Sequence, residues 1–308
     1  MSVPMDDTFI HYLAAKKTVD DRALNAGVWV ALSTELSRSD NPSALSVLEI
    51  GAGIGTMVER TLERGLFSGN VHYLLVDEQP ANLAEARHRL PVWAERHGWK
   101  AVWAGELLLL SSGRQTVKVQ FAVEDALAFA AKGGFLADLL IAHAFLDLVH
   151  LPTALPILLS TLRPGGLFAF TLNFDGVTTF EPTIDPPLDA QIEALYHADM
   201  DGRIVNGKPS GDSHSGRHLL SLCCSMGADV LAAGSSDWVV FPTRGHYPDD
   251  EAYFLHTIIR FVDKALRENP NLDSNRFLRW VEARHAQVDM AELVYVAHQL
   301  DVLGRWFG

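Results

Sequence analysis

Residues 47–56 read VLEIGAGIGT and connect a short apolar run to MVERTLERGL, in which the apolar residues recur at helical spacing. This order predicts a strand, a glycine turn and a helix. Gly51, Gly53 and Gly55 can adopt positive backbone dihedrals, and without side chains they let a ligand lie directly against the main chain. The turn therefore suits a nucleoside-type cofactor.

Strand and helix patterns continue to alternate along the chain. The run VHYLLV ends before Asp77, and a helical pattern opens with Pro80 near its first turn. There follow two extended runs around 111–114, a strand at 138–145, a helix at 151–163 and a strand at 165–174. Repeated strand and helix units of this kind predict a parallel sheet with helices on both faces.

The two ends of the chain show helical patterns. Apolar residues in 8–36 lie at three- and four-residue spacings, and three helical patterns follow Asp249 with no strand pattern between them. We expect three parts: an N-terminal helical lid over 1–40, a core over 41–248 and a helical C-terminal extension over 249–308. The apolar stripes of the extension can pack on the sheet, cover a pocket or pair two subunits, so a homodimer is one hypothesis.

Composition and charge disfavour several classes of protein. The 308 residues include 25 Lys and Arg against 38 Asp and Glu, a net charge of −13, and 48% are apolar, as in a soluble globular protein. Nucleic-acid binding needs clustered positive charge, which this balance disfavours. The most apolar window, 139–159, is interrupted by His, Asp and Pro and is not a membrane span. Because Cys223 and Cys224 are adjacent and rarely able to pair, we expect a reducing, cytoplasmic setting.

Two acidic residues accompany the glycine turn. Asp77 follows Gly55 by 22 residues at the carboxyl end of the second strand, where a carboxylate can accept both hydroxyls of a ribose. Position 56 is Thr, whereas the dinucleotide fingerprint GxGxxG has its third glycine there, so pyrophosphate binding is disfavoured. Glu49 precedes the first glycine by two residues and can orient the turn or bind a cationic group. This block resembles class I S-adenosylmethionine-dependent methyltransferases.

Three further motifs extend the resemblance over about residues 45–175: LLVDEQPANLAEAR at 74–87, VEDA at 123–126 and LRPGGLFAF at 162–170. It implies a Rossmann-like, doubly wound α/β fold with seven mostly parallel strands, the last one antiparallel. It also implies S-adenosylmethionine as cofactor and S-adenosylhomocysteine as product. The residues that it places around the cofactor are Glu49, Gly51, Ala52, Gly53 and Gly55 at the amino acid part, Asp77 at the ribose, Asp125 and Ala126 at the adenine, and Ala142 beside them. Asp125 can equally be a helix N-cap, a role that does not exclude adenine contact, and Glu124 replaces it if the register differs by one.

The acceptor side departs from part of this family. Residues 142–150, AHAFLDLVH, lack the (N/D)PP(Y/F) pattern of methyltransferases that modify amino groups of nucleic acids and proteins. With the acidic charge, this favours a small organic acceptor. His143 is the candidate general base because imidazole exchanges protons near neutral pH, with a packing or adenine-edge role as the alternative. Tyr12, Phe145, Asn173 and Arg217 are candidate substrate contacts. We expect no metal, because the His and Asp residues lack tight metal spacing.

These patterns predict a cytoplasmic methyltransferase that acts on a small molecule, without nucleic-acid or membrane partners. Two alternatives stay open. One is an NAD(P)-dependent oxidoreductase, for which the sheet and Asp77 serve equally well but Thr56 does not. The other is a non-catalytic, methyltransferase-like scaffold whose helical tail binds a protein partner.

Overall fold

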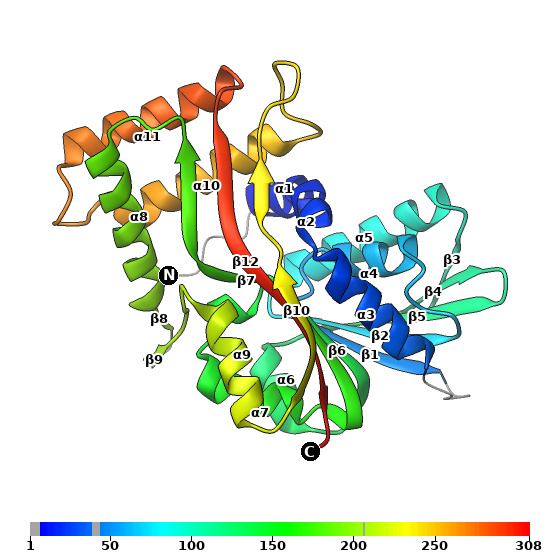
Figure 1. The fold of residues 1–308 in the computed structure, drawn as a ribbon. Coiled ribbons are helices and arrows are strands. Elements are labelled where there is room, and N and C mark those ends of the chain that lie inside the picture. Colours follow the sequence, from blue (N-terminus) through cyan, green and yellow to red (C-terminus); the bar gives the residue numbers. More distant parts are fainter. Residues whose placement is uncertain (1–6, 39–43, 206) are drawn as a thin grey trace.

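The computed structural model describes residues 7–38, 44–205 and 207–308. Its central sheet contains the strands β1 (Leu45–Ile50), β2 (Val71–Asp77), β3 (Lys100–Ala104), β4 (Leu107–Ser112), β5 (Gln115–Val123), β6 (Ala137–His143), β7 (Leu162–Glu181), β10 (Asp229–Ser235), β11 (Trp238–Val240) and β12 (Val294–Trp306). Their order is β10-β12-β7-β6-β1-β2-β5-β4-β3, with β11 paired to β12 (Figure 1). Two short strands, β8 (Ile204–Val205) and β9 (Lys208–Pro209), form a separate hairpin.

The sheet is mostly parallel, as the sequence predicted. Strand β1 pairs in parallel with β2 on one side and with β6 on the other, so the strand order reverses there. Strand β12 runs antiparallel between β7 and β10. The expected count of seven strands is wrong, because the antiparallel hairpin β3–β4 extends the edge at β5 and β11 adds to β12. Leu108 and Leu110 of β4 are fully buried, which stabilises this extension.

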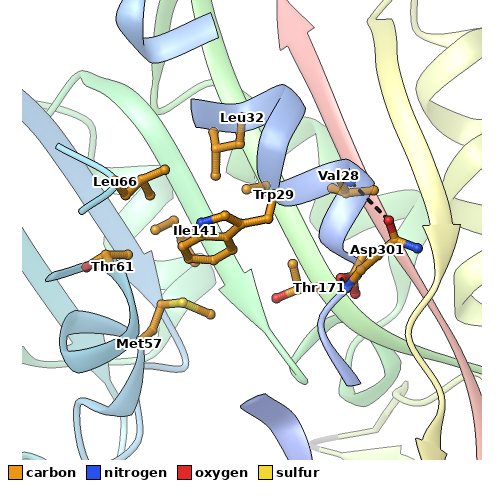
Figure 2. Close-up of a pocket in the computed structure, with 11 residues that line it drawn as sticks. Val28, Trp29, Leu32, Met57, Thr61, Leu66, Ile141, Thr171 and Asp301 are labelled. Atoms are coloured by element: carbon orange, nitrogen blue, oxygen red, sulfur yellow. Dashed lines mark hydrogen bonds between the residues drawn. The ribbon is translucent and has the colours of Figure 1, made fainter. Parts of the chain in front are cut away.

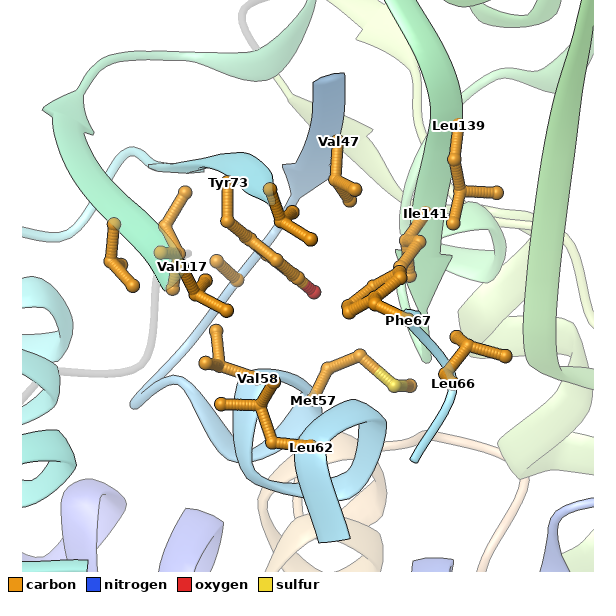
Figure 3. Packing of buried hydrophobic residues seen from close by; sticks show 14 of the residues in the cluster. Val47, Met57, Val58, Leu62, Leu66, Phe67, Tyr73, Val117, Leu139 and Ile141 are labelled. Atoms are coloured by element: carbon orange, nitrogen blue, oxygen red, sulfur yellow. The ribbon is translucent and has the colours of Figure 1, made fainter. Parts of the chain in front are cut away.

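Helices cover both faces of the sheet. On one face lie α3 (Ala26–Ser37), α4 (Thr56–Glu63) and α5 (Pro80–Arg96), and on the other α6 (Ala126–Lys132), α7 (Leu151–Leu159) and α9 (Ser215–Ser225). Figure 3 shows Met57, Val58 and Leu62 of α4 facing Val47 and Ile141 of the strands. This burial of apolar side chains on both faces explains why the parallel strands are apolar almost throughout.

A third apolar cluster lies where β7 and β12 run on beyond the other strands (Figure 1). It is built by α1 (Asp7–Ala15), α2 (Lys17–Ala23), α8 (Pro186–Asp201), α10 (Glu251–Leu266) and α11 (Ser274–Asp289). It includes the aromatic side chains of Tyr12, Phe254, Trp280 and Tyr295. Within the described ranges, we find no helix with the length and hydropathy that a bilayer crossing needs.

The C-terminal region corrects two expectations. Residues 290–306, expected to be a third helix of the extension, end in β12, which pairs with β7 from Val294 opposite Glu181 to Trp306 opposite Gly166. The strand predicted over 165–174 does not end there, because β7 continues to Glu181. The apolar residues of 290–306 fit helical and alternating spacing alike, and the open edges of β7 and β10 select the strand because they need hydrogen-bond partners. Only α10 and α11 of the extension are helical.

Candidate functional site

The carboxyl ends of the parallel strands bring three sequence motifs together. Ile50 is in register with Val76 of β2 on one side and with Ala142 of β6 on the other. The next residue of each strand, Gly51, Asp77 and His143, therefore reaches the same edge of the sheet. This edge also carries the point at which the strand order reverses, where doubly wound sheets bind their ligands.

The glycine turn leaves the main chain open at Gly53, whereas the side chains of Phe145 and Leu90 lie against Gly51 and Gly55. Gly51, Gly53 and Gly55 have φ angles of 60°, 54° and 79°, in the region that favours glycine. The turn is fastened to the neighbouring strand, because the Gly53 N–H donates to Asp77 Oδ2 at 2.8 Å and the Ala52 N–H donates to the Val76 carbonyl at 3.1 Å. Among the described residues, a Cβ at Gly53 would meet only Leu13 of α1 within 4 Å, at 3.7 Å. A ligand can thus approach the main chain here.

Asp77 is held in a fixed orientation by its neighbours. Its Oδ1 accepts hydrogen bonds from the Gln79 N–H at 2.8 Å and from Asn82 Nδ2 at 3.1 Å. Burial raises the pKa of Asp77, although the three hydrogen bonds oppose that shift. Asn82 Oδ1 is buried and has no hydrogen-bond partner among the described residues. The Asp77 carboxylate is a charged acceptor, and Asn82 Oδ1 is a neutral acceptor without a partner among the described residues. Together they fit a ribose diol, which brings two hydroxyl donors.

The expected adenine motif follows β5. The Glu124 N–H donates to the Asp77 carbonyl at 3.0 Å, so this segment is joined to the ribose end of the site. Asp125 is exposed and accepts from the Ala128 N–H at 2.7 Å, which confirms the alternative that it is the N-cap of α6. Ala126 is buried, and Ala142 is fully buried inside β6.

Glu49 lies in β1 below the turn, with its side chain buried. Its Oε2 accepts a hydrogen bond from the Tyr73 hydroxyl at 2.7 Å. Burial raises the pKa of Glu49 to about 8, while the Tyr73 hydrogen bond opposes the shift. A carboxyl group that is protonated at neutral pH has no charge with which to attract a cationic group.

His143 is enclosed by protein partners at both ring nitrogens. Nδ1 lies 2.8 Å from Thr171 Oγ1, and Nε2 lies 3.1 Å from both Arg60 Nη1 and Asp20 Oδ2. Burial and the Arg60 charge lower its pKa to about 4, although Asp20 opposes them. Arg60 can only donate and the Asp20 carboxylate can only accept, so the tautomer of the neutral ring decides which of them Nε2 bonds.

Sequence reasoning missed the charged groups around His143. Arg60, fully buried in α4, pairs with Asp20 and Asp21 of α2, and Asp20 lies 3.4 Å from Lys16. Trp238 of β11 donates to Asp20 Oδ1 at 3.0 Å. Burial alone would raise the pKa of Asp20, but Lys16 and the other polar contacts outweigh it and hold the pKa well below its ordinary value. The sequence signal that could have revealed these groups is Arg60, which lies on the apolar side of the helical pattern of α4.

Of the aromatic candidates, Phe145 lies at the glycine turn and Tyr12 does not. A Cβ on Gly51 would come within 2.4 Å of Phe145 Cδ2, so that ring rests directly on the turn. Tyr12 of α1 is buried against the C-terminal helices, with its ring centroid 5.8 Å from that of Phe254 and 5.2 Å from that of Phe261. Burial raises the pKa of Tyr12 well above its ordinary value.

Asn173 and Arg217 make contacts within the fold. Asn173 is fully buried, and its Nδ2 donates to the carbonyls of Phe170 at 3.0 Å and Leu300 at 2.8 Å, joining β7 to β12. The Arg217 side chain is 55% exposed and pairs with Asp175 at 2.9 Å. Neither residue is among those that border the glycine turn within 4 Å of a glycine Cβ position.

Two cavities lie away from the turn. One of about 10 Å³ beneath α3, lined by residues that include Trp29, Thr171 and Asp301, has room for about one water molecule (Figure 2). The other, of about 240 Å³, lies between β7, α8, α10 and α11 and has Arg284 in its wall. The glycine turn and Asp77 line neither cavity, so the candidate cofactor site is the sheet edge itself.

No family model matches this sequence, and no curated protein matches it. Solved structures do match. A SAM-dependent methyltransferase from Thiobacillus denitrificans in complex with S-adenosyl-L-homocysteine is 14% identical over 98% of this chain and 99% of its own, with a TM-score of 0.48. A putative sarcosine dimethylglycine methyltransferase from Galdieria sulphuraria is 14% identical over 97% and 98%, with a TM-score of 0.43. A cyclopropane synthase from Mycobacterium tuberculosis is 10% identical over 91% and 83%, with a TM-score of 0.42.

Proposed function

We propose that this chain is a class I S-adenosylmethionine-dependent methyltransferase that acts on a small-molecule acceptor. The observation that carries the proposal is the hydrogen bond of 2.8 Å from the Gly53 N–H to Asp77 Oδ2. It joins the glycine turn to an oriented carboxylate where the strand order reverses, and this is the arrangement that a nucleoside ligand needs.

Different residues of the sheet edge would contact different parts of the cofactor. Asp77 and Asn82 would hold the ribose, the backbone of 51–55 would face the amino acid part, and 124–126 would border the adenine. S-adenosylmethionine, when bound, supplies an activated methyl group on a sulfonium. The chain itself then has to hold an acceptor in line with that group, which requires positioning more than acid–base chemistry.

A small acceptor suits the way the edge is covered. Leu13 of α1 reaches over Gly53, and α2 is pinned to α4 through the buried Arg60. The net charge of −13 disfavours polyanionic acceptors. Because the pKa of His143 lies near 4, the ring is neutral at physiological pH. It can act as a base only after a ring nitrogen is released from its protein partners.

The dinucleotide alternative is disfavoured by Thr56. This residue opens α4, and its Oγ1 accepts a hydrogen bond from Arg60 Nη1 at 3.1 Å. The third glycine of the dinucleotide fingerprint, which allows close packing beside a pyrophosphate, is therefore replaced by a side chain with a contact of its own.

Isothermal titration calorimetry tests the proposal. Chain freed of co-purified ligand is titrated with S-adenosylmethionine, S-adenosylhomocysteine, NAD and NADP. We expect dissociation constants of about 1 to 100 μM for the first two alone, or roughly −8 to −5 kcal/mol. Binding of only a nicotinamide would replace the proposal with an oxidoreductase. If none of the four ligands binds, the non-catalytic scaffold replaces the proposal. Labelled methyl transfer to a panel of small acceptors then tests catalysis.

A further inference from the structure

A second group of polar side chains lies between the end of α8 and the start of α9. Asp201 is the last residue of α8, and Asp212 and His214 come just before α9. Each of the three offers one ligand atom, and these atoms all lie within 4.8 Å of one another. From the sequence we expected no metal, because the His and Asp residues lack tight metal spacing. The fold brings Asp201, which lies 11 residues before Asp212 in the sequence, next to Asp212 and His214.

Neighbouring residues hold these three side chains in place. The Ser213 N–H donates to Asp201 Oδ1 at 2.7 Å, and the Ser213 hydroxyl lies 3.1 Å from Asp201 Oδ2 and 2.9 Å from His214 Nδ1. The shared hydroxyl places His214 Nδ1 beside Asp201. On the other side of the ring, a Cβ at Gly176 would lie 2.7 Å from His214 Nε2, so only glycine admits the imidazole against β7.

The charges of this group are left without a Lys or Arg partner. Asp212 pairs with His218, whose Nδ1 lies 2.7 Å from Asp212 Oδ2, and within the described ranges Asp201 forms no ion pair with Lys or Arg. Two neighbouring carboxylates repel each other, and a bound cation relieves that repulsion.

We propose that Asp201, Asp212 and His214 bind a divalent first-row transition metal, with Zn²⁺ and Mn²⁺ as the ions to test. Two carboxylates and one imidazole form a mixed oxygen and nitrogen ligand set without thiolate, which suits these ions better than Cu⁺. Three protein ligands leave coordination positions open for water or another ligand. His218 is a positioning residue, because its hydrogen bond orients Asp212.

Calorimetry on the full chain, without an affinity tag and after chelator treatment, tests the site. It uses ZnCl₂ and MnCl₂ as probes, with no S-adenosylmethionine present, so failure here is separate from failure of the proposed function. We expect one ion per chain, with binding in each of Asp201→Asn and His214→Ala weakened beyond the about 10- to 100-fold that the loss of an outer-shell partner costs. His218→Ala should weaken binding by a smaller factor. Far-UV circular dichroism establishes that each variant is folded.

His285→Ala is the matched control. His256 and His285, with Nδ1 atoms 2.8 Å apart, are an imidazole pair between α10 and α11 that lies outside the proposed site. The control should bind Zn²⁺ as the wild type does. The proposal is overturned if the wild type shows no saturable binding up to about 1 mM. It is also overturned if folded Asp201→Asn and His214→Ala bind like the wild type, or if His285→Ala abolishes binding. Co²⁺ substitution gives a second readout, since a lost visible absorption band in His214→Ala assigns the imidazole as a ligand.

Discussion

At the scale of single residues, Asp77 combines a structural contact with a binding role. It accepts from the Gly53 and Gln79 main chain and from Asn82, and these bonds orient both carboxylate oxygens. Each carboxylate oxygen has two acceptor positions, so Oδ2 can still accept a hydroxyl while it holds the turn. The residue that positions the glycine turn is thus also the one available to a ribose.

Replacing Asp77 with Ala should weaken binding of S-adenosylmethionine by about 1 to 3 kcal/mol, because charge-assisted hydrogen bonds are lost. Calorimetry measures the change. Glu78→Ala removes an exposed carboxylate one position along and serves as the control with unchanged affinity. Equal affinities of wild type and folded Asp77→Ala would contradict the ribose assignment.

Glu49 should make stability depend on pH in the direction opposite to most carboxylates. Its pKa of about 8, raised by burial from an ordinary value of 4.5, means that the folded chain holds a proton that the unfolded chain has released. Its contribution is complete below pH 4.5 and is lost as the pH rises through about 8. Tyr73, Arg60 and Asp77 are the other groups that act on this carboxyl.

Urea denaturation at about pH 6 and pH 9 measures this effect. A group that holds a proton only in the folded chain makes the free energy of unfolding fall as the pH rises. The wild type should lose stability at the higher pH, and Glu49→Gln should lose much less. Glu78→Gln, at an exposed position, should follow the wild type. Parallel pH profiles for wild type and Glu49→Gln would show that the buried carboxyl does not hold the proton.

At the scale of elements, the contact between α2 and α4 is polar and buried. Arg60 of α4 and Asp20 of α2 are 0% and 1% exposed, and Lys16 and Trp238 also contact Asp20. A buried ion pair adds little net stability, but removal of one partner leaves the other charge unpaired and dehydrated. The attachment of α2 at the sheet edge therefore depends on Arg60.

Arg60→Met should lower the free energy of unfolding by about 3 to 5 kcal/mol, because Asp20 stays buried while it loses one of its cationic partners. Chemical denaturation monitored by circular dichroism measures the loss. Arg267→Met removes an exposed pair with Asp263 and should stay close to wild type. If the two variants lose similar amounts of unfolding free energy, the contact between α2 and α4 is not the buried network of Arg60 and Asp20.

At the scale of the whole molecule, the final strand joins the edge strands β10 and β11 to the rest of the sheet. Strand β12 pairs with β7 over their whole shared length on one edge and with β10 and β11 on the other. Its partners precede it by more than fifty residues, so the sheet closes only when the C-terminus is present. The third apolar cluster, which packs on the far ends of β7 and β12, depends on the same strand.

A chain that stops before residue 294 should fail to form a cooperative fold, because β7 and β10 would each keep an unpaired edge in the interior. Thermal unfolding followed by circular dichroism and calorimetry checks this outcome. A chain that stops after Trp306 loses only Phe307 and Gly308 and should melt like the full chain. A sharp, wild-type transition in the shorter chain would show that β12 is dispensable.

The sequence by itself determined the features that depend on residues close together in the chain. The strand, turn and helix at 45–63, the carboxylate at the end of β2 and the N-cap at Asp125 all follow from local spacing and backbone preference, and the structure contains each of them. Tertiary structure decided the rest. Residues 294–306 form a strand because distant edges needed hydrogen-bond partners, although their spacing also fits a helix.

The same distinction holds at the site. Arg60 meets Asp20 from 40 residues away, and His143 meets Asp20 from 123 residues away, so no local pattern could reveal that the candidate base has partners at both nitrogens. Asp201 and His214 likewise come together only after α8 and α9 pack on β7. Local preferences determine turns and caps, whereas burial and charge pairing between distant segments determine which polar groups share one environment.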